Sequence, residues 1–435
     1  MKTILVFAVM MLAAFSAHGT QQQFYPEEYF QTLIAADGGS VEITRFTGTG
    51  TEVRIPPYIQ GLPVTAIGDM AFWGRQLTYV AIPESVIHIG VGAFNGNLLA
   101  SVVIPDGLTH IEALAFGVNL IAEVNIPEGV IYIGVGAFTF NRLTSVTIPE
   151  GVRYIESGAF GENLLAEVVI PNSVSYIGNG AFFGNELTSV TIPTGIRIID
   201  YWAFAFNRLT SVVIPDGVTH IRVGAFAENQ LAEVVIPNSV IYIEEAAFAL
   251  NQLASVNIPN GVERIGDSAF YGNQLASVTL PASIRYIDNW TFAKNRLTSV
   301  VIPDGVRVIG RAAFEENLLA EVVIPNSVRY IHNRAFFVNR LTLVVIPESV
   351  IEIGMLAFAS NRLAGVTIPG NVTRVENWAF QWNNLEYVVM PRSVTHVGNW
   401  AFARNRLGSV AIPNSETEIA ENAFDPGVAV TIGAE

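Results

Sequence analysis

The hydrophobic and polar positions of the chain repeat with a strict period of 22 residues. One unit is clearest in residues 209–230, LTSVVIPDGVTHIRVGAFAENQ. A Phe stands at every 22nd residue from Phe72 to Phe424, 17 in all, and no insertion or deletion interrupts this column. Such a period predicts a solenoid, because one unit cannot bury its apolar face alone and must stack on its neighbours. We therefore expect one elongated domain.

Each unit predicts two short strands joined by a turn. Leu209, Val212 and Ile214 are the inward residues of the first strand. This strand ends at Pro215, because proline has no N–H to donate to a ladder. Turn-forming pairs such as Asp-Gly and Asn-Ser come next, and the VxxI segment after them predicts a second short strand. The Ala-Phe pair is expected in one helical turn on the outer wall.

The column of Phe residues and a second column, of Asn residues, predict an internal structural ladder. Asn recurs every 22 residues from Asn97 to Asn405, 15 times in all. A buried amide can donate to the carbonyl of one coil and accept from the N–H of the next, which would satisfy turn backbone in the interior. The alternative is a ladder of asparagines that binds a ligand. The residues that represent the structural ladder in the central coils are Phe204, Asn207, Phe226 and Asn229.

The two ends of the chain depart from the repeat. Residues 20–74 form an N-terminal cap with an atypical first coil, in which residues 57–63 are an inserted loop. The regular solenoid spans residues 75–424, and residues 425–435 supply a C-terminal capping strand. Atypical terminal coils are what a solenoid needs to shield its open core.

Residues 1–19, MKTILVFAVMMLAAFSAHG, predict a signal peptide that is cleaved near Gly19. One Lys precedes an apolar run, and small residues follow it. The run is shorter than the roughly 20 residues that span a membrane. We therefore expect a secreted protein, extracellular or periplasmic, with no lipid or cell-wall anchor in the sequence and no membrane insertion.

Composition narrows the classes of partner. The formal net charge is −15, and only 14% of the residues are charged. An acidic surface disfavours nucleic acid and anionic lipid, since neither would gain counterion release or attraction. The absence of cysteine excludes disulfides, Cys-ligated metals and cysteine catalysis. No sequence motif calls for a cofactor or a metal site.

Several segments resemble the BspA-like class of bacterial leucine-rich repeats. They are LTSVVIP and VTHIRVGAF in the repeat, and EITRFTGTGTEVRIP and LPVTAIGDMAF in the cap. Family units commonly have 23 residues with Gly-Cys after the Ala-Phe, whereas these have 22 with Asn in that region. The resemblance implies a mainly β repeat protein, a right-handed parallel solenoid. For some members it also implies adhesion to host matrix proteins or to other cells.

Two variable columns are candidates for binding a protein or glycan, such as extracellular matrix or another cell surface. The position before Ile in VxxI is Tyr or His in ten of sixteen units, which predicts a stacked ladder along one side. Its candidate residues are Tyr132, Tyr154, Tyr176, His220, Tyr242, Tyr286 and Tyr330. An outward position of the first strand carries four possible charged anchors, Glu123, Glu167, Glu233 and Glu321. A merely structural stack and a solvated sheet face are the alternatives.

Other residues suggest chemistry only weakly. His88 and His110 could lie on adjacent coils, but no third ligand joins them at metal-binding spacing. Four tryptophans precede Ala or Thr and then Phe, and would fill the outer wall or form a carbohydrate platform: Trp202, Trp290, Trp378 and Trp400. The adjacent carboxylates Glu244–Glu245 and Glu315–Glu316 are expected on an exposed outer face.

The preferred interpretation is an exported, non-enzymatic, adhesin-like protein that binds through its extended surface. The first alternative is a structural rod or coat without a specific ligand. A remote alternative is a polysaccharide-acting β-solenoid enzyme, since such enzymes assemble acidic residues across coils.

Overall fold

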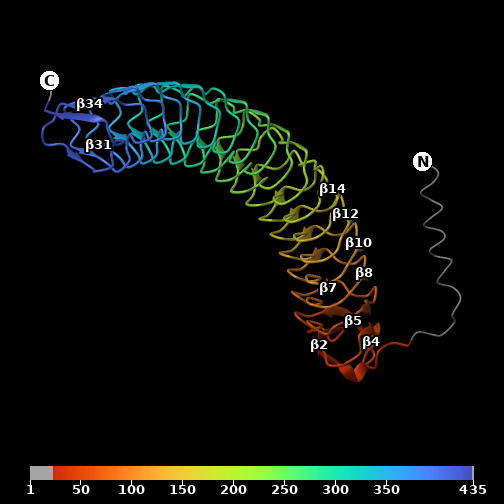
Figure 1. Ribbon diagram of the computed structural model, residues 1–435. Coiled ribbons are helices and arrows are strands. Elements are labelled where there is room, and N and C mark those ends of the chain that lie inside the picture. Colours follow the sequence, from red (N-terminus) through yellow and green to blue (C-terminus); the bar gives the residue numbers. More distant parts are fainter. Residues whose placement is uncertain (1–22, 434–435) are drawn as a thin grey trace.

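The computed structural model describes residues 23–433, which wind into a curved rod of stacked coils (Figure 1). The rod begins with an N-terminal cap and ends at β36 (Ala429–Ile432). This architecture confirms the predicted parallel solenoid of 22-residue units. The predicted signal peptide lies outside the described residues.

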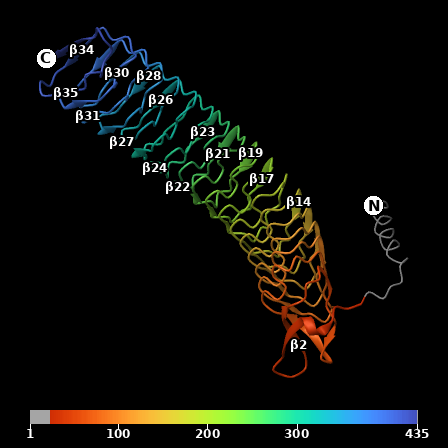
Figure 2. The same ribbon diagram turned by 60° about the horizontal axis from the view of Figure 1, so that its bottom comes forward.

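The first strand of each unit joins the strand-A ladder, which runs along one side of the rod (Figure 2). Equivalent residues of neighbouring coils pair in parallel, as in Val212 with Val234. The coils around Thr191 and Val301 join only through isolated bridges. The strand-A ladder consists of β3 (Glu52–Arg54), β6 (Tyr79–Ala81), β8 (Ser101–Val103), β10 (Glu123–Asn125), β12 (Ser145–Thr147), β14 (Glu167–Val169), β17 (Ser211–Val213), β19 (Glu233–Val235), β21 (Ser255–Asn257), β23 (Ser277–Thr279), β26 (Glu321–Val323), β28 (Leu343–Val345), β30 (Gly365–Thr367), β32 (Tyr387–Val389), β34 (Ser409–Ile412) and β36.

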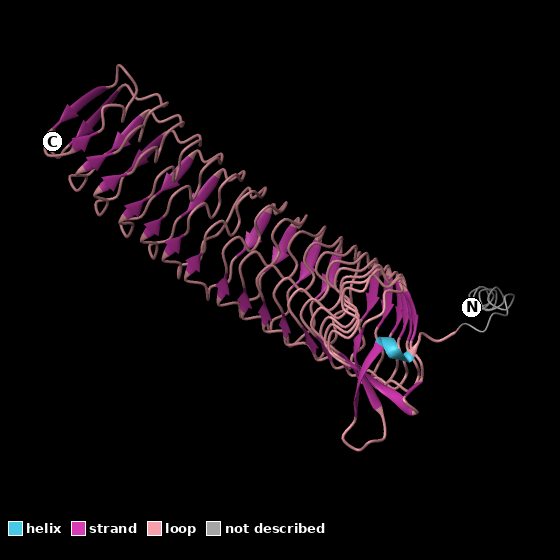
Figure 3. Ribbon diagram, turned by 90° about the horizontal axis from the view of Figure 1, so that it is seen from below, coloured by secondary structure: helices cyan, strands magenta, loops and turns pink. Residues whose placement is uncertain are grey.

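The VxxI segments form the strand-B ladder on another side of the rod, so that two separate columns of strands follow its length (Figure 3). Each strand is two residues long, with its Ile or Val turned inward. The strand-B ladder consists of β7 (His88–Ile89), β9 (His110–Ile111), β11 (Tyr132–Ile133), β13 (Tyr154–Ile155), β15 (Tyr176–Ile177), β16 (Ile198–Ile199), β18 (His220–Ile221), β20 (Tyr242–Ile243), β22 (Arg264–Ile265), β24 (Tyr286–Ile287), β25 (Val308–Ile309), β27 (Tyr330–Ile331), β29 (Glu352–Ile353), β31 (Arg374–Val375), β33 (His396–Val397) and β35 (Glu418–Ile419).

The outer wall, around each Ala-Phe pair, consists of turns, and the predicted helical turn is wrong. Ala225 donates its N–H to Arg222 at 3.1 Å, but the N–H of Phe226 donates to Ala247 of the next coil at 2.9 Å. Every second backbone N–H of this turn thus donates to the neighbouring coil. Too few N–H groups remain within the coil to form the i→i−4 hydrogen bonds of a helix. The residue two before Phe is left-handed, as in Trp202 with φ 54°. Only η1 (Glu27–Tyr29) is helical in the described chain.

Phenylalanine rings stack through the core from one end of the rod to the other. Phe204 and Phe226 have ring centroids 5.7 Å apart with an interplanar angle of 8°. Both rings are fully buried. The stack extends beyond the repeat into the cap, because Phe46 stacks on Phe72 at 5.3 Å. One continuous hydrophobic core therefore runs the length of the solenoid.

The asparagine column bonds each turn to the one before it. The side chain of Asn229 donates to the carbonyls of Phe204 at 2.9 Å and Phe226 at 3.2 Å. Its Oδ1 accepts from the N–H of Leu209 at 3.0 Å. Asn207 makes the same contacts 22 residues earlier. The amides therefore satisfy interior backbone groups, as a structural ladder requires.

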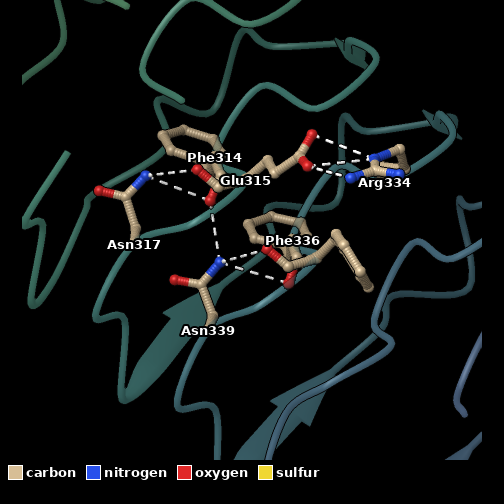
Figure 4. A network of polar contacts seen from close by, with 7 residues as sticks. Phe314, Glu315, Asn317, Arg334, Phe336 and Asn339 are labelled. Carbon is tan, nitrogen blue, oxygen red and sulfur yellow. Dashed lines mark hydrogen bonds and ion pairs between the residues drawn. The ribbon is translucent and has the colours of Figure 1, made fainter. Parts of the chain in front are cut away.

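Figure 4 shows two consecutive rungs of this ladder beside a partly buried ion pair. Asn317 and Asn339 both donate to the carbonyl of Phe314. Glu315 is only 6% exposed and accepts hydrogen bonds from Arg334 of the next coil. The prediction of an exposed Glu315 is wrong, because its carboxylate turns toward this guanidinium.

The N-terminal cap closes the core with a small sheet and an aromatic cluster. In it β1 (Phe30–Ile34) pairs antiparallel with β2 (Val41–Phe46), and β2 pairs with β5 (Leu62–Ile67). β4 (Tyr58–Ile59) forms a hairpin with β5 inside the predicted inserted loop. Phe46 is fully buried between Tyr25, Phe30 and Phe72. At the far end, β36 pairs with β34 alone.

Candidate binding surface

The strand-B ladder brings most of the predicted Tyr and His residues onto one side of the rod. Tyr154 pairs with Tyr132 on one flank and Tyr176 on the other. His220 pairs with Tyr242 in the same way. All of these side chains are exposed or half-buried, because they alternate with the inward Ile of each strand.

The aromatic column is not one continuous stack. Ring centroids are 5.6 Å apart between His110 and Tyr132, and 6.5 Å apart between Tyr132 and Tyr154, with tilted planes. His220 and Tyr242 are closest, at 4.9 Å. Ile198 separates the two runs, and Val308 isolates Tyr286 from Tyr330. Ring contacts therefore occur in two short runs within the predicted ladder.

The second aromatic run opens onto a groove of about 500 Å³ in the middle of the rod. The groove joins His220 and Tyr242 to Arg264, which continues their column on the next coil. Carboxylates from the bends that follow strand B also line it: Glu244, Glu245 and Asp267. An imidazole, a phenol, a guanidinium and three carboxylates therefore converge on one accessible hollow.

Local contacts hold the side chains of this groove. The hydroxyl of Tyr242 donates to Glu263 at 3.3 Å, and Arg264 donates to Asp288 at 3.0 Å. Thr219 Oγ1 lies 2.8 Å from His220 Nδ1. Such partners reduce the rotamer freedom that a bound ligand would otherwise have to restrict. The groove is consequently pre-organised in the free protein.

A second polar cluster lies two coils toward the N-terminus. The Tyr176 hydroxyl donates to Asp200 at 3.5 Å, and burial, followed by the charge of Asp200, raises the pKa of this phenol. Arg222 donates to the Tyr201 hydroxyl at 2.8 Å and lies over its ring. Sequence reasoning missed Tyr201 and Arg222, although reading the columns three and four residues before Phe would have revealed them.

An aromatic hollow adjoins that cluster on the outer wall. Phe183 and Phe206 have ring centroids 5.1 Å apart, and Trp202 lies 6.4 Å from Phe206. They line a concavity of about 500 Å³. Trp202 and Trp400 are 37% and 38% exposed, so these rings cover the wall without being sealed inside it. Phe206 also escaped the sequence analysis, because its column varies from coil to coil.

The four predicted Glu anchors lie on the strand-A ladder, separate from the aromatic column. Each is exposed, but residues such as Ser145 and Ser211 stand between them, so they do not form one cluster. Beside them runs a column rich in exposed valines, with Val301 and Val323 both 78% exposed. The structure therefore does not unite the Glu and Tyr candidates in one site.

Within residues 23–433, no cluster of three or more His, Asp or Glu side chains is arranged to hold a metal ion. The same residues contain no helix of the length and apolarity needed to cross a membrane.

Comparison with known sequences identifies the family of the repeats. The profile of the BspA type Leucine rich repeat region, with 6 copies, matches residues 65–185, 154–274, 223–339 and 307–427. The chain belongs to this family. Leucine-rich-repeat proteins of this kind are generally binding scaffolds, and often bind proteins or lie at surfaces.

Solved structures of bacterial leucine-rich-repeat proteins are similar to this chain, and the one from Bacteroides ovatus shows the same fold. A leucine-rich repeat protein from Bacteroides ovatus is 23% identical, with a TM-score of 0.58, over 93% of this chain and 98% of that one. One from T. pallidum is 31% identical over 37% of this chain and 89% of its own, with a TM-score of 0.32. YopM from Yersinia enterocolitica is 16% identical over 88% and 91%, with a TM-score of 0.47. No curated protein matches.

Proposed function

We propose that this chain is an exported, non-enzymatic, adhesin-like protein that recognises a protein or glycan partner through its strand-B face. The groove of His220, Tyr242 and Arg264 carries the proposal. Tyr and Arg are enriched among the residues that dominate binding energy, and they act best in a partly enclosed, pre-organised setting. The chain belongs to a family of binding scaffolds, which supports this function.

Direct binding tests the proposal. The purified exported protein is applied to an array of extracellular-matrix proteins and glycans, beside a groove variant that carries Tyr242→Ser and Arg264→Ala. The matched control carries Tyr286→Ser and Tyr330→Ser, which alter the same column outside the groove. We expect saturable binding that the groove variant loses and the control retains.

The other outcomes discriminate between the alternatives. Binding that both variants retain would move the site to the strand-A face, where replacement of Glu123 and Glu167 by Ser would be tested next. Absence of binding by the unaltered protein would contradict the proposal and favour a structural rod. A shortening of glycan chains would instead favour the enzymatic alternative.

Export is the second part of the proposal and rests on residues 1–19. The intact mass of the exported protein should show that the chain begins at or next to Thr20. Retention of Met1 in a fraction that lies inside the cytoplasm would contradict it.

A further inference from the structure

Charge is segregated along the rod. Residues 23–263 contain 8 Lys and Arg against 23 Asp and Glu, whereas residues 264–406 contain 14 against 10. The N-terminal half is thus strongly acidic, and most of the C-terminal half has a net positive charge. A field of this kind can orient one molecule against another.

The segregation is sharpest on the turn edge, the side of the rod where each strand A turns into strand B. Four consecutive coils carry an exposed carboxylate at the first turn position after proline. None of the four has an ion pair with any of residues 23–433. This acidic row consists of Glu84, Asp106, Glu128 and Glu150.

An arginine row lies farther along the same edge. Arg285, Arg307 and Arg329 occupy consecutive coils, and their backbones are joined by hydrogen bonds of 2.8 and 2.9 Å. All three side chains are exposed. Arg285 donates to the carbonyl of Ala282 at 3.0 Å, and Ala282 stands at the turn position that carries acid in the other row. The two rows therefore share one edge.

Neither row is neutralised by its own edge. Within the coils of the acidic row Arg153 is the only cation in the columns of the two rows, and within the coils of the arginine row Asp304 is the only anion, with Glu263 and Glu348 on the coils to either side. No ion pair joins Arg153 or Asp304 to a row within the described chain. Like charges on adjacent strands repel each other. Each row therefore carries repulsion that an oppositely charged partner would relieve.

The spacing of the charges along each row favours a second copy of the chain over an extended peptide as the partner. Neighbouring coils lie about 4.8 Å apart, so each row repeats at that step, and a row on another copy of the chain repeats identically. Side chains on one face of an extended peptide repeat about every 6.6 Å, which would lose register over three coils. Ile87 and Ile131, 61% and 44% exposed, lie beside the acidic row and offer apolar contact for arginine side chains.

We propose that two copies associate in antiparallel orientation along the turn edge, with the acidic row of each against the arginine row of the other. Because both rows lie on one edge, a two-fold axis allows both contacts to form at once. A parallel, staggered arrangement would leave one row of each end copy unmatched. The association adds an oligomeric state to the proposed binding function and does not depend on it.

Sedimentation velocity of the purified protein tests the proposal. We expect a dimer in about 20 mM salt and a monomer in about 500 mM, because salt screens exposed charges. Replacement of the arginine row by Glu, or of the acidic row by Lys, should give monomers in low salt. The two variants mixed in equal amounts should form a dimer again, since all their facing rows are then complementary.

A matched control reverses three exposed arginines from another column, Arg296, Arg340 and Arg362, and should leave the dimer intact. Circular dichroism shows whether each variant folds. A monomeric wild-type protein in low salt, an open-ended polymer, or a mixture that stays monomeric would overturn the proposal. Dextran sulfate tests the remaining possibility, that the arginine row binds a polyanion and not a second copy of the chain. Its binding to a monomeric wild type, lost with the arginine row, would identify a polyanion site instead.

Discussion

A single buried amide holds each turn of the solenoid to the previous one. Asn229 makes contacts that water cannot replace, since it is 7% exposed and its partners are backbone groups of the interior. A buried polar group left without its partner costs roughly 1–3 kcal/mol. The amide column is therefore an energetic requirement as well as a sequence signature.

Asn229→Ala is expected to lower the free energy of unfolding by roughly 1–3 kcal/mol, because it leaves the buried Leu209 N–H unsatisfied and removes one of the two amide donors to the Phe204 carbonyl, the other being Asn207. Urea unfolding followed by circular dichroism measures the change. Gln230→Ala, one residue away and exposed, is the matched control and should change the value by less than about 0.5 kcal/mol. Equal effects of the two variants would contradict the structural role of the ladder.

Residues in strict columns were predictable, and residues in variable columns were not. All 17 units repeat the Phe and 15 of them repeat the Asn, so the burial of these residues follows from the period. The Glu315–Arg334 pair depends on a left-handed Arg334, with φ 63°, which directs that side chain toward the preceding coil. The left-handed position recurs two residues before each Phe, often as glycine, but the side chain that stands there and its partner on the preceding coil vary. The exposed position expected for Glu315 was consequently wrong.

At the scale of the element, the coil is the unit of structure. Both strand types could be read from their apolar spacing and from the proline that ends strand A. The turns of the outer wall could not be read in this way. Hydrogen bonds between coils, such as that from the Gly224 N–H to the Glu245 carbonyl at 2.9 Å, compete there with the hydrogen bonds of a helix. Local propensity for a helical turn is overridden once neighbouring coils supply the acceptors.

Removal of residues 209–230 should leave a folded protein. The deletion joins Arg208 to Leu231 and preserves the period, so Phe204 can stack on Phe248 as it does on Phe226. We expect an unchanged circular dichroism spectrum per residue and a cooperative urea transition. Stability in such arrays is a sum over units and their interfaces.

The control for this deletion removes half a coil, residues 209–219. It joins Arg208 to His220 and places strand B where strand A should begin, so the coils after the junction lose register with the coils before it. We expect loss of the cooperative transition, or aggregation. A half-coil deletion as stable as the full-coil deletion would show that register does not govern the fold.

At the scale of the whole molecule, the sequence predicted the parallel solenoid of 22-residue units. It did not reveal the groove at Tyr242, because the shape of that hollow depends on side chains from three coils and their bends. Single columns were visible in the sequence, whereas convergence between columns required coordinates.

The two ends of the rod are closed unequally, which predicts where it opens first. All four residues of β36 are exposed, and that strand pairs only with β34. At the other end Val41, Ile43 and Phe46 are fully buried beneath paired strands. Regions with few buried contacts open most readily. Amides of β36 should therefore exchange with deuterium on the order of tenfold faster than those of β2.

Replacement of the residue that closes the N-terminal end should remove this difference. Phe46→Ala deletes the ring that covers Phe72, and such a change in a core costs about 3–5 kcal/mol. Because coils stabilise their neighbours, the loss should spread inward from β2 and leave the central coils protected. Tyr58→Ala, at an exposed position of the same cap, is the control and should leave exchange unchanged. If β2 stayed protected in Phe46→Ala, the aromatic cluster would not be what seals that end, and the paired strands of the cap would have to do so alone.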